Sequence, residues 1–218
     1  MVFLTVSDEV VPAIYSLNIK DRFRNIDAIF GCGDLPAYYL EFIVTMLARP
    51  CFYVEGNHND VEYTDAGEVL HEPRGCVRVE GRSILHNGLI VAGLGGSLRY
   101  NQDSGAQYTD TQMLARVWAL APRLLLNRLR YGRYLDVMLT HAPPLGIHNG
   151  PDWPHRGFDA FLRLMDWFAP RYLIHGHIHR SYGFSAVTET RYKQTMVLNT
   201  AGYRLLTIDA PASERAAG

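Results

Sequence analysis

Polar residues with metal-binding side chains follow five predicted strands, each at the point where an apolar run ends. In chain order they are Ser7-Asp8, Gly31-Cys32-Gly33-Asp34, Gly56-Asn57-His58-Asn59, His141-Ala142-Pro143-Pro144 and His177-Ile178-His179. Their carboxylates, carboxamide and imidazoles would meet at one rim of a sheet. This mixture of oxygen ligands and imidazoles suits divalent Mn, Fe or Zn better than Mg or Ca alone. The glycines fit because the backbone must turn sharply beside a crowded site.

Short apolar runs supply the strands that would carry these residues. They are residues 2–6, 27–30, 51–55, 89–94, 135–140, 171–176, 195–200 and 204–209. The earlier runs are continuous rather than alternating, which indicates strands buried on both faces. The last runs have no helix between them, so we expect an antiparallel addition to a mixed sheet.

Helical patterns separate several of the strands. They occupy 12–24, 37–48, 109–130 and 157–169, and Pro122 predicts a break or kink in the third. We expect Met113, Leu114, Val117, Trp118 and Leu120 to form part of the core because they recur at helical spacing. Strands that alternate with helices predict a layered α/β fold with its active residues at the carboxyl ends of the strands.

Length and composition limit the class of protein. A chain of 218 residues that is 48% hydrophobic can bury a sizeable core, and we expect one domain over 1–210 with a loose tail over 211–218. The 21 basic residues nearly cancel the 22 acidic ones, so charge alone would hold neither a nucleic acid nor an anionic membrane. Cys32, Cys51 and Cys76 lack the spacing of a disulfide framework or a structural zinc site. With no export signal or membrane span in view, the sequence predicts a cytoplasmic protein.

The ordered motifs resemble those of the calcineurin-like metallophosphoesterases. Asp8, GD at 33–34, GNH at 56–58, HAPP at 141–144 and GHIH at 176–179 follow that family's order, and the resemblance extends over residues 2–209. It implies a four-layer sandwich of two mixed β-sheets flanked by helices. It also implies a two-metal site that hydrolyses small phosphate esters by attack of a metal-bound hydroxide at phosphorus. Two cations bridged by a carboxylate and a water would activate that water and hold the attacking and leaving oxygens.

The resemblance assigns a role to each motif residue. The first metal would take Asp8, Asp34 and His179. The second metal would take Asp34, Asn57, His141 and His177, so that Asp34 bridges the two. Asp34 and His58 would be the catalytic residues, with His58 contacting the phosphoryl group or donating a proton to the leaving oxygen. Asn57 and His58 would also bind the substrate, and the predicted metal is Mn, with Fe or Zn as alternatives.

The first motif departs from the family's usual Asp-x-His, because Val10 stands where the imidazole would be. Valine binds no metal, so the first metal keeps three protein ligands against four at the second. We therefore predict that the second site fills first and that the first is weak. Glu9 is an alternative ligand, but the favoured interpretation makes it an acid in the first turn of a helix that carries Pro12, directed away from Asp8.

A second departure is Asn59, where the family commonly has an acid after GNH. A carboxylate would raise the pKa of the neighbouring histidine more than an amide does. His58 would then be a poorer acid, which favours substrates with good leaving groups, such as activated diesters.

The remaining candidates lie in loops and strand ends. His148, Asp152, His155 and Arg156 could line the substrate pocket from the loop 143–161, where Arg156 could hold a phosphate oxygen. The alternative is that these residues fold the loop upon itself, and for His148 and Asp152 the two readings stand equal. We expect His175 to be buried or to support a ligand, Arg99 or Tyr100 to reach the cleft, and one of Tyr38 and Tyr39 to flank it.

Two classes of function compete. The first is a metal-dependent phosphoesterase, with phosphodiesters preferred because the short chain has no obvious large docking insert, and with a phosphomonoesterase or nucleotide hydrolase as the alternative. The second is a non-catalytic scaffold, since the retromer scaffold subunit shares this fold. The retained ligands favour the enzyme, because carboxylates and imidazoles clustered at one rim stabilise no scaffold. The valine at position 10 is the argument for the scaffold.

Overall fold

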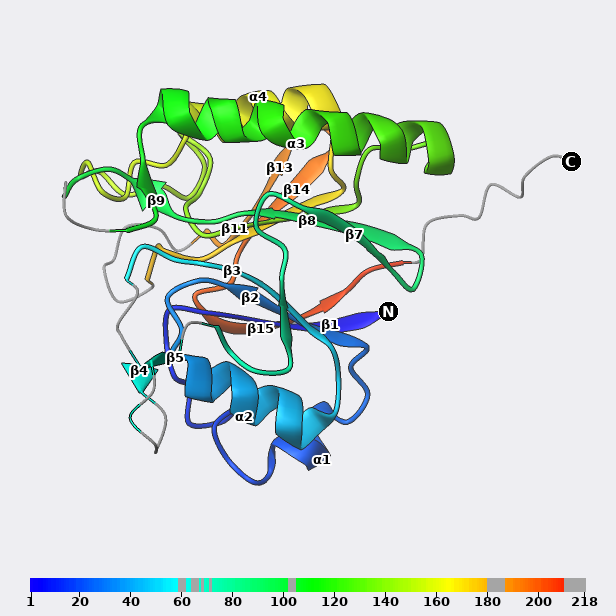
Figure 1. Ribbon diagram of the computed structural model, residues 1–218, viewed down its shortest axis with the longest axis vertical. Coiled ribbons are helices and arrows are strands. Elements are labelled where there is room, and N and C mark those ends of the chain that lie inside the picture. The colour runs from blue at the N-terminus through cyan, green and yellow to red at the C-terminus, as the bar shows by residue number, and fades with distance from the viewer. Residues whose placement is uncertain are drawn as a thin grey trace, which may run out of the picture.

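Two β-sheets lie face to face, and helices cover the outer side of each, in the computed structural model of the chain (Figure 1). The structure describes residues 1–58, 62–63, 67, 69–70, 72–101, 105–179 and 187–209. Helices α1 (Ile19–Phe23) and α2 (Ala37–Leu47) lie on one side, and α3 (Asp110–Tyr131) and α4 (Asp159–Phe168) lie on the other. The predicted four-layer sandwich is confirmed.

The first sheet is mostly parallel and has the strand order β15-β1-β2-β3-β6. Its strands are β1 (Val2–Ser7), β2 (Ala28–Cys32), β3 (Cys51–Val54), β6 (Cys76–Arg78) and β15 (Gly202–Thr207). Only β15 runs antiparallel within this sheet, beside β1, where Val2 pairs with Thr207. The carboxyl ends of β1, β2 and β3 therefore point to one edge, because these three strands are parallel.

The second sheet has the order β13-β14-β12-β11-β8-β7. Its strands are β7 (Ser83–His86), β8 (Leu89–Leu94), β11 (Val137–Thr140), β12 (Tyr172–His175), β13 (Glu189–Tyr192) and β14 (Thr195–Asn199). The four central strands are parallel, and β7 and β13 are antiparallel edges. The expected C-terminal antiparallel addition is thus divided: β13 adds to this sheet, β14 is parallel to β12, and β15 crosses to the first sheet.

Two short strand pairs accompany the large sheets. Strand β4 (Glu62–Tyr63) pairs antiparallel with β5 (Val69–Leu70). Strand β9 (Ser97–Leu98) pairs parallel with β10 (Gln107–Tyr108), just beyond the carboxyl end of β8.

Alternation along the buried strands divides the core into three layers. In β2, Phe30 packs between the two sheets, whereas Ile29 packs against α1 and α2. In β8, Val91 lies between the sheets and Ile90 packs under α3 and α4. Successive side chains of a strand point to opposite faces, so both faces of these continuous apolar runs are buried.

The helices follow the predicted pattern in part. The predicted helices over 37–48 and 157–169 are confirmed as α2 and α4, but the one over 12–24 is wrong: residues 12–18 form turns and only α1 is helical. The N–H groups of Ile14 and Tyr15 both bond to the carbonyl of Val11, and that of Ser16 returns to Ile14, so the first turn does not propagate. Helix α3 continues through Pro122, because this residue lies on the exposed face, where water can satisfy the carbonyl that loses its partner.

Trp118 is not the core residue that its spacing predicts. Its side chain is 56% exposed and its ring lies 4.7 Å from that of Trp167 on α4. Met113, Val117 and Leu120 are buried as expected, and Leu114 is partly buried. Trp118 follows Val117 directly and so lies about 100° further around the helix, off the buried face.

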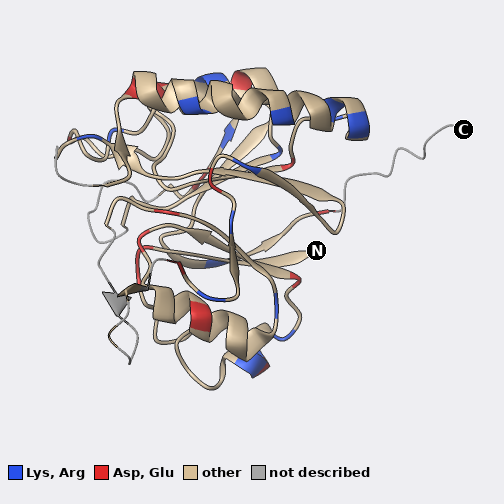
Figure 2. Cartoon of the chain, viewed as in Figure 1, with Lys and Arg blue, Asp and Glu red and all other residues tan. Residues whose placement is uncertain are grey.

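Charged residues are interspersed on the outer helices (Figure 2). Helix α3 has Asp110 in its first turn and Arg128 and Arg130 in its last, each favourable with the helix dipole, and Thr109 forms a capping box with Gln112. In the described part of the chain, no helix combines the length and the apolar character that crossing a membrane requires. The predicted tail over 211–218 lies outside the described residues, so the domain boundary stays a prediction.

Candidate metal centre

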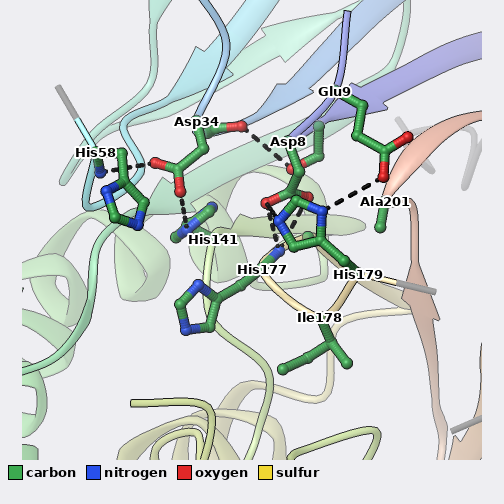
Figure 3. A network of polar contacts seen from close by, with 12 residues as sticks. Asp8, Glu9, Asp34, His58, His141, His177, Ile178, His179 and Ala201 are labelled. Carbon is green, nitrogen blue, oxygen red and sulfur yellow. Dashed lines mark hydrogen bonds and ion pairs between the residues drawn. The ribbon is translucent and has the colours of Figure 1, made fainter. Parts of the chain in front are cut away.

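Side chains from both sheets meet where their parallel strands end (Figure 3). The first sheet contributes three positions, Asp8 after β1, Asp34 after β2 and Asn57 after β3, and the second contributes His141 after β11 and His177 and His179 after β12. His58 follows Asn57 on the exposed side of this group. The predicted ligands therefore gather, although they derive from two sheets rather than from one rim.

The backbone is left-handed at three of these residues. Their φ angles are 66° for Asp8, 53° for Asp34 and 67° for His177, a region that costs a residue with a Cβ about 1 kcal/mol or more. Glu9 N–H bonds to Ser7 at 2.8 Å and Ile178 N–H bonds to Gly176 at 2.8 Å, so Asp8 and His177 each form the centre of a tight γ-turn. Strain of this kind persists only where the surrounding structure enforces it, and here it lies at the candidate ligands.

Asp8 and His177 hold each other across the two sheets. The backbone N–H of His177 donates to both carboxylate oxygens of Asp8, at 2.9 and 3.0 Å. Burial raises the pKa of Asp8, and its carboxylate is fully buried. The link fixes the strand end of β1 against that of β12.

Two glycines permit this close approach. A Cβ on Gly56 would lie 1.8 Å from Oδ1 of Asp34, and a Cβ on Gly176 would lie 1.8 Å from Oγ of Ser7. Both distances are far inside van der Waals contact. Glycine is required at each position because the site packs directly against the backbone.

The best assembled ligand group contains Asp34, His141 and His177. Among the described residues, this is the group of three His, Cys, Asp or Glu side chains whose ligand atoms all lie within 4.8 Å of one another. His141 Nε2 lies 3.2 Å from Oδ2 of Asp34 and 3.0 Å from Oδ1 of Asn57. Asn57 donates its amide to the hydroxyl of Tyr100 at 3.1 Å, which directs its carbonyl oxygen toward His141.

The hydrogen bonds of His141 leave a place for a positive charge. Its Nδ1 must donate to the carbonyl of Cys32, 2.8 Å away, because a carbonyl only accepts. A neutral ring would then turn the lone pair of Nε2 toward two oxygen acceptors. Burial opposes the charged ring, yet the Asp34 and Asp8 carboxylates raise the pKa of His141 to about 9. The arrangement is satisfied by a proton on Nε2 or by a cation among these ligands.

His177 is held in the form that binds metals. Its Nε2 donates to the carbonyl of Pro154 at 3.0 Å, so Nδ1 keeps the lone pair. Burial and the neighbouring His141 bring the pKa of His177 well below its ordinary value. Burial also opposes the charge of Asp34, but His141 and the N–H of His58, 2.9 Å from Oδ1, keep the pKa of this carboxyl low. A carboxylate beside neutral imidazoles and an amide oxygen fits a divalent cation.

Glu9 does not start a helix, contrary to the favoured interpretation. Residues 12–18 are turns, and the γ-turn at Asp8 brings the Glu9 carboxylate to His179, with Oε1 3.3 Å from Nδ1 (Figure 3). The other ring nitrogen of His179, Nε2, lies 3.8 Å from Oδ1 of Asp8. Val10 is 37% exposed. Consecutive acids thus face opposite sides of one imidazole.

The loop after His141 contributes one of its predicted residues to the site. The ring of His155 lies 4.9 Å from that of His177, and its Nδ1 is within 2.8 Å of both carboxylate oxygens of Asp152. The Arg156 guanidinium lies 5.4 Å from the ring of Trp153 and is directed to that ring. For Asp152, the contact with His155 matches the reading in which the loop folds upon itself.

His148 belongs to the interior and not to a pocket wall. Its Nδ1 lies 3.0 Å from Nε2 of His175, and its Nε2 lies 2.8 Å from the hydroxyl of Thr190. His175 is fully buried, as expected, and its Nδ1 bonds to the carbonyl of Gly176 at 2.9 Å. These bonds support the strand end that carries His177.

Of the other candidates, Tyr100 reaches the site and Arg99 does not. Arg99 binds the carbonyl of Gln107 and the side chain of Gln112. Tyr39 is buried, as expected for the one that packs inward, and its hydroxyl accepts from the N–H of Val11. The ring of Tyr38 packs against that of Tyr15. Asn59 lies outside the described residues.

Sequence reasoning missed the groups that orient the ligands. The carbonyls of Cys32 and Pro154 fix the two imidazole tautomers, and the hydroxyl of Ser7 bonds to the carbonyls of Cys32 and Gly33. Any residue has a backbone carbonyl, so the residue types carry no signal for it. The Ser7 hydroxyl could have been noticed, since it directly precedes Asp8.

A sandwich of two mixed sheets with acid, amide and imidazole ligands at their joined edge defines the metallophosphoesterase class of fold. The chain belongs to the calcineurin-like phosphoesterase family, whose model matches residues 18–181. The matched region starts after Asp8, so the departing first motif lies outside it.

Two solved structures share the fold at low sequence identity. One crystal structure has a TM-score of 0.62 at 13% identity, over 94% of each chain. The protein TT1561 of Thermus thermophilus has a TM-score of 0.58 at 15% identity, over 92% of this chain and 89% of that one. A single mutant of Vps29 from Entamoeba histolytica has a TM-score of 0.47 at 16% identity, over 96% and 87%. A comparison with curated proteins finds no match.

Proposed function

We propose that the chain is a metal-dependent phosphoesterase that hydrolyses phosphodiesters. The observation that carries the proposal is the ring of His141, whose Nε2 faces oxygens of Asp34 and Asn57 at 3.2 and 3.0 Å. Membership of the calcineurin-like phosphoesterase family supports the reaction class. A carboxylate, a carboxamide and a buried imidazole gathered in one place would not stabilise an inert scaffold.

The residues divide into two ligand sets. The tighter set would be Asp34, Asn57, His141 and His177, and the weaker set would be Asp8, Asp34 and His179. Divalent ions bound there would polarise a phosphoryl oxygen and activate a water for in-line attack. Imidazole and oxygen ligands together favour Mn, with Fe or Zn as alternatives.

The protein's own groups position the ester and move a proton. His58 is exposed and lies beside Asp34, whose Oδ1 accepts the backbone N–H of His58 at 2.9 Å (Figure 3). From there the protonated ring can donate to the leaving oxygen. The Tyr100 hydroxyl accepts from the side-chain amide of Asn57 and so orients the Asn57 carbonyl oxygen. Asn57 would also contact the substrate.

Charge near the site favours a diester over a monoester. A monoester carries about two negative charges at neutral pH and a diester carries one. The two cationic candidates of the adjoining loop are engaged by other partners: His155 by Asp152 at 2.7 Å, and Arg156 by the ring of Trp153. Less positive charge is therefore directed at the ester, which suits the singly charged substrate.

The test is hydrolysis by the chelator-treated chain with Mn added or withheld. We expect turnover of bis(p-nitrophenyl) phosphate to require Mn and to exceed that of p-nitrophenyl phosphate by at least about tenfold in kcat/KM. Asp34→Asn should lower it by about 100-fold or more. Asp166→Asn is the matched control, because Asp166 on α4 pairs with Lys193 outside the site.

Each other result has a definite meaning. A preference for the monoester would contradict the diester assignment while retaining a phosphoesterase. If the chain binds no metal and shows no turnover at millimolar Mn, the result contradicts the enzyme and favours a scaffold.

A further inference from the structure

We propose that Glu9 is a positioning residue for the first metal: its carboxylate holds Nδ1–H of His179 and thereby directs Nε2 at Asp8. The purpose of this device rests on the proposed function, because an oriented imidazole is needed where a metal binds. The contact itself does not depend on that function.

The two nitrogens of His179 have different surroundings. Nδ1 lies 3.3 Å from Oε1 of Glu9, within hydrogen-bonding range. Nε2 lies 3.8 Å from Oδ1 of Asp8, which is too far for a hydrogen bond. Two ligand atoms that are each about 2.1 Å from one cation can be at most about 4.2 Å apart. The longer distance therefore fits a cation shared by His179 and Asp8.

The chemistry of a carboxylate fixes the tautomer. Ionised Glu9 can only accept, so Nδ1 of His179 must carry the hydrogen. The neutral ring then has its lone pair on Nε2, on the side of Asp8. A carboxylate that holds the second nitrogen of a ligating histidine fixes the ring orientation and raises its basicity.

Burial separates the roles of the two acids. The Asp8 side chain is fully buried, whereas that of Glu9 is 50% exposed and that of His179 is 24% exposed. Glu9 therefore contacts the ring from its outer, Nδ1 side, as Figure 3 shows, and the imidazole stands between it and Asp8. This placement favours an orienting role over direct ligation.

The γ-turn explains how neighbouring residues reach opposite sides of one ring. The left-handed Asp8, with φ of 66°, reverses the chain between the two side chains, and the Glu9 N–H returns to Ser7. In a regular strand or helix, the side chains of two consecutive residues would point in different directions and would not both face one ring. With Val10 contributing no imidazole, orientation of His179 is what remains to strengthen the weaker set.

The first experiment measures the tautomer of His179 by ¹⁵N NMR of the metal-free full chain, at about pH 8, above the ordinary histidine pKa. The His179 signals are assigned by their loss in His179→Asn. We expect protonated Nδ1 in the parent chain and a gain of the Nε2-protonated form in Glu9→Ala. Glu189→Ala is the matched control, since the Glu189 carboxylate is 49% exposed and pairs with Arg204. It should leave the His179 signals unchanged.

The second experiment measures Mn affinity by a titration that is monitored by EPR. Glu9→Ala should lower the Mn affinity of the weaker site by about 10- to 100-fold and leave that of the tighter site within about twofold of the parent value. Glu9→Asp should recover part of the loss, and Glu189→Ala should cause none.

The outcomes separate this inference from the proposed function. A His179 tautomer that is the same in Glu9→Ala as in the parent overturns the inference, even if Mn affinity falls, because Glu9 would then be a direct ligand. If the parent chain binds no Mn, the proposed function fails, and the NMR result still decides whether Glu9 orients His179.

Discussion

Oδ2 of Asp34 lies 3.2 Å from Nε2 of His141, and this contact joins the carboxyl end of β2 in one sheet to that of β11 in the other. His141 has no room for adjustment, because it is fully buried and its second nitrogen is held by the carbonyl of Cys32. The pair is therefore set by the fold before any ligand binds. The negative charge of the Asp34 carboxylate favours a proton on the buried imidazole.

Metal binding should release a proton from His141. The pKa of about 9 applies to the metal-free ring, so below pH 9 a cation must displace the proton on Nε2. Apparent Mn affinity should rise about tenfold per pH unit from about 7 and level off near pH 9. Calorimetry in buffers of different ionisation enthalpy should give about one proton per tightly bound Mn at pH 7.5. Binding without proton release would contradict the charged His141.

Gly56→Ala should reduce hydrolysis by about 100-fold, since a displacement near 1 Å at a reacting group has this effect. The new Cβ would lie 1.8 Å from Oδ1 of Asp34 and 2.4 Å from its backbone nitrogen, so the carboxylate or the turn must move. Gly105→Ala is the matched control because its Cβ would meet nothing within 4 Å. Steady-state kinetics with the diester compares the two. Equal activity would mean that the position of Asp34 is not critical.

Asn57→Ala should lower the Mn affinity of the tighter site by about 10- to 100-fold, because it removes a ligand oxygen and the link to Tyr100. Val10→His should instead raise the Mn affinity of the weaker site, because it restores an imidazole to the first motif. Asn25→Ala, at an exposed residue, serves as control. Mn titration followed by EPR should resolve two phases in the parent chain. Affinities that neither substitution changes would contradict the assignment of the two ligand sets.

His148 should make the fold less stable in acid. Burial lowers the pKa of His148 to about 4, so between pH 6.5 and 4 the unfolded chain binds a proton that the folded chain does not. The free energy of unfolding should therefore fall as the pH falls through this window. Urea titrations should show a smaller fall in His148→Gln than in the parent or in His86→Gln. Parallel curves for all three would exclude His148 as a source of acid sensitivity.

The continuous apolar runs predict a layered α/β fold, and the order of the motifs, through the resemblance to the calcineurin-like family, predicts the sandwich and its ligands. Residues such as Asp34 and His141 could be placed because each directly follows a run that is buried on both faces. The same logic could not divide the strands between two sheets, since the direction of a crossover such as that to β15 depends on long-range pairing.

The local geometry at Asp8 shows where sequence patterns end. An acid pair before Pro12 is typical of a helix start, but tertiary bonds from His177 hold Asp8 in a γ-turn, and Glu9 turns to His179. Propensity is a weak guide where the surrounding structure compensates strain. Trp118 was misplaced for a simpler reason: apolar character does not reveal which face of an amphipathic helix a residue occupies.

The most direct measurement is the anomalous scattering of Mn in crystals of the full chain soaked with Mn and phosphate. We expect a strong peak among Asp34, Asn57, His141 and His177, and a weaker peak among Asp8, Asp34 and His179, with phosphate between them and beside His58. Absence of anomalous density among Asp34, Asn57, His141 and His177, at millimolar Mn, would contradict the metal centre.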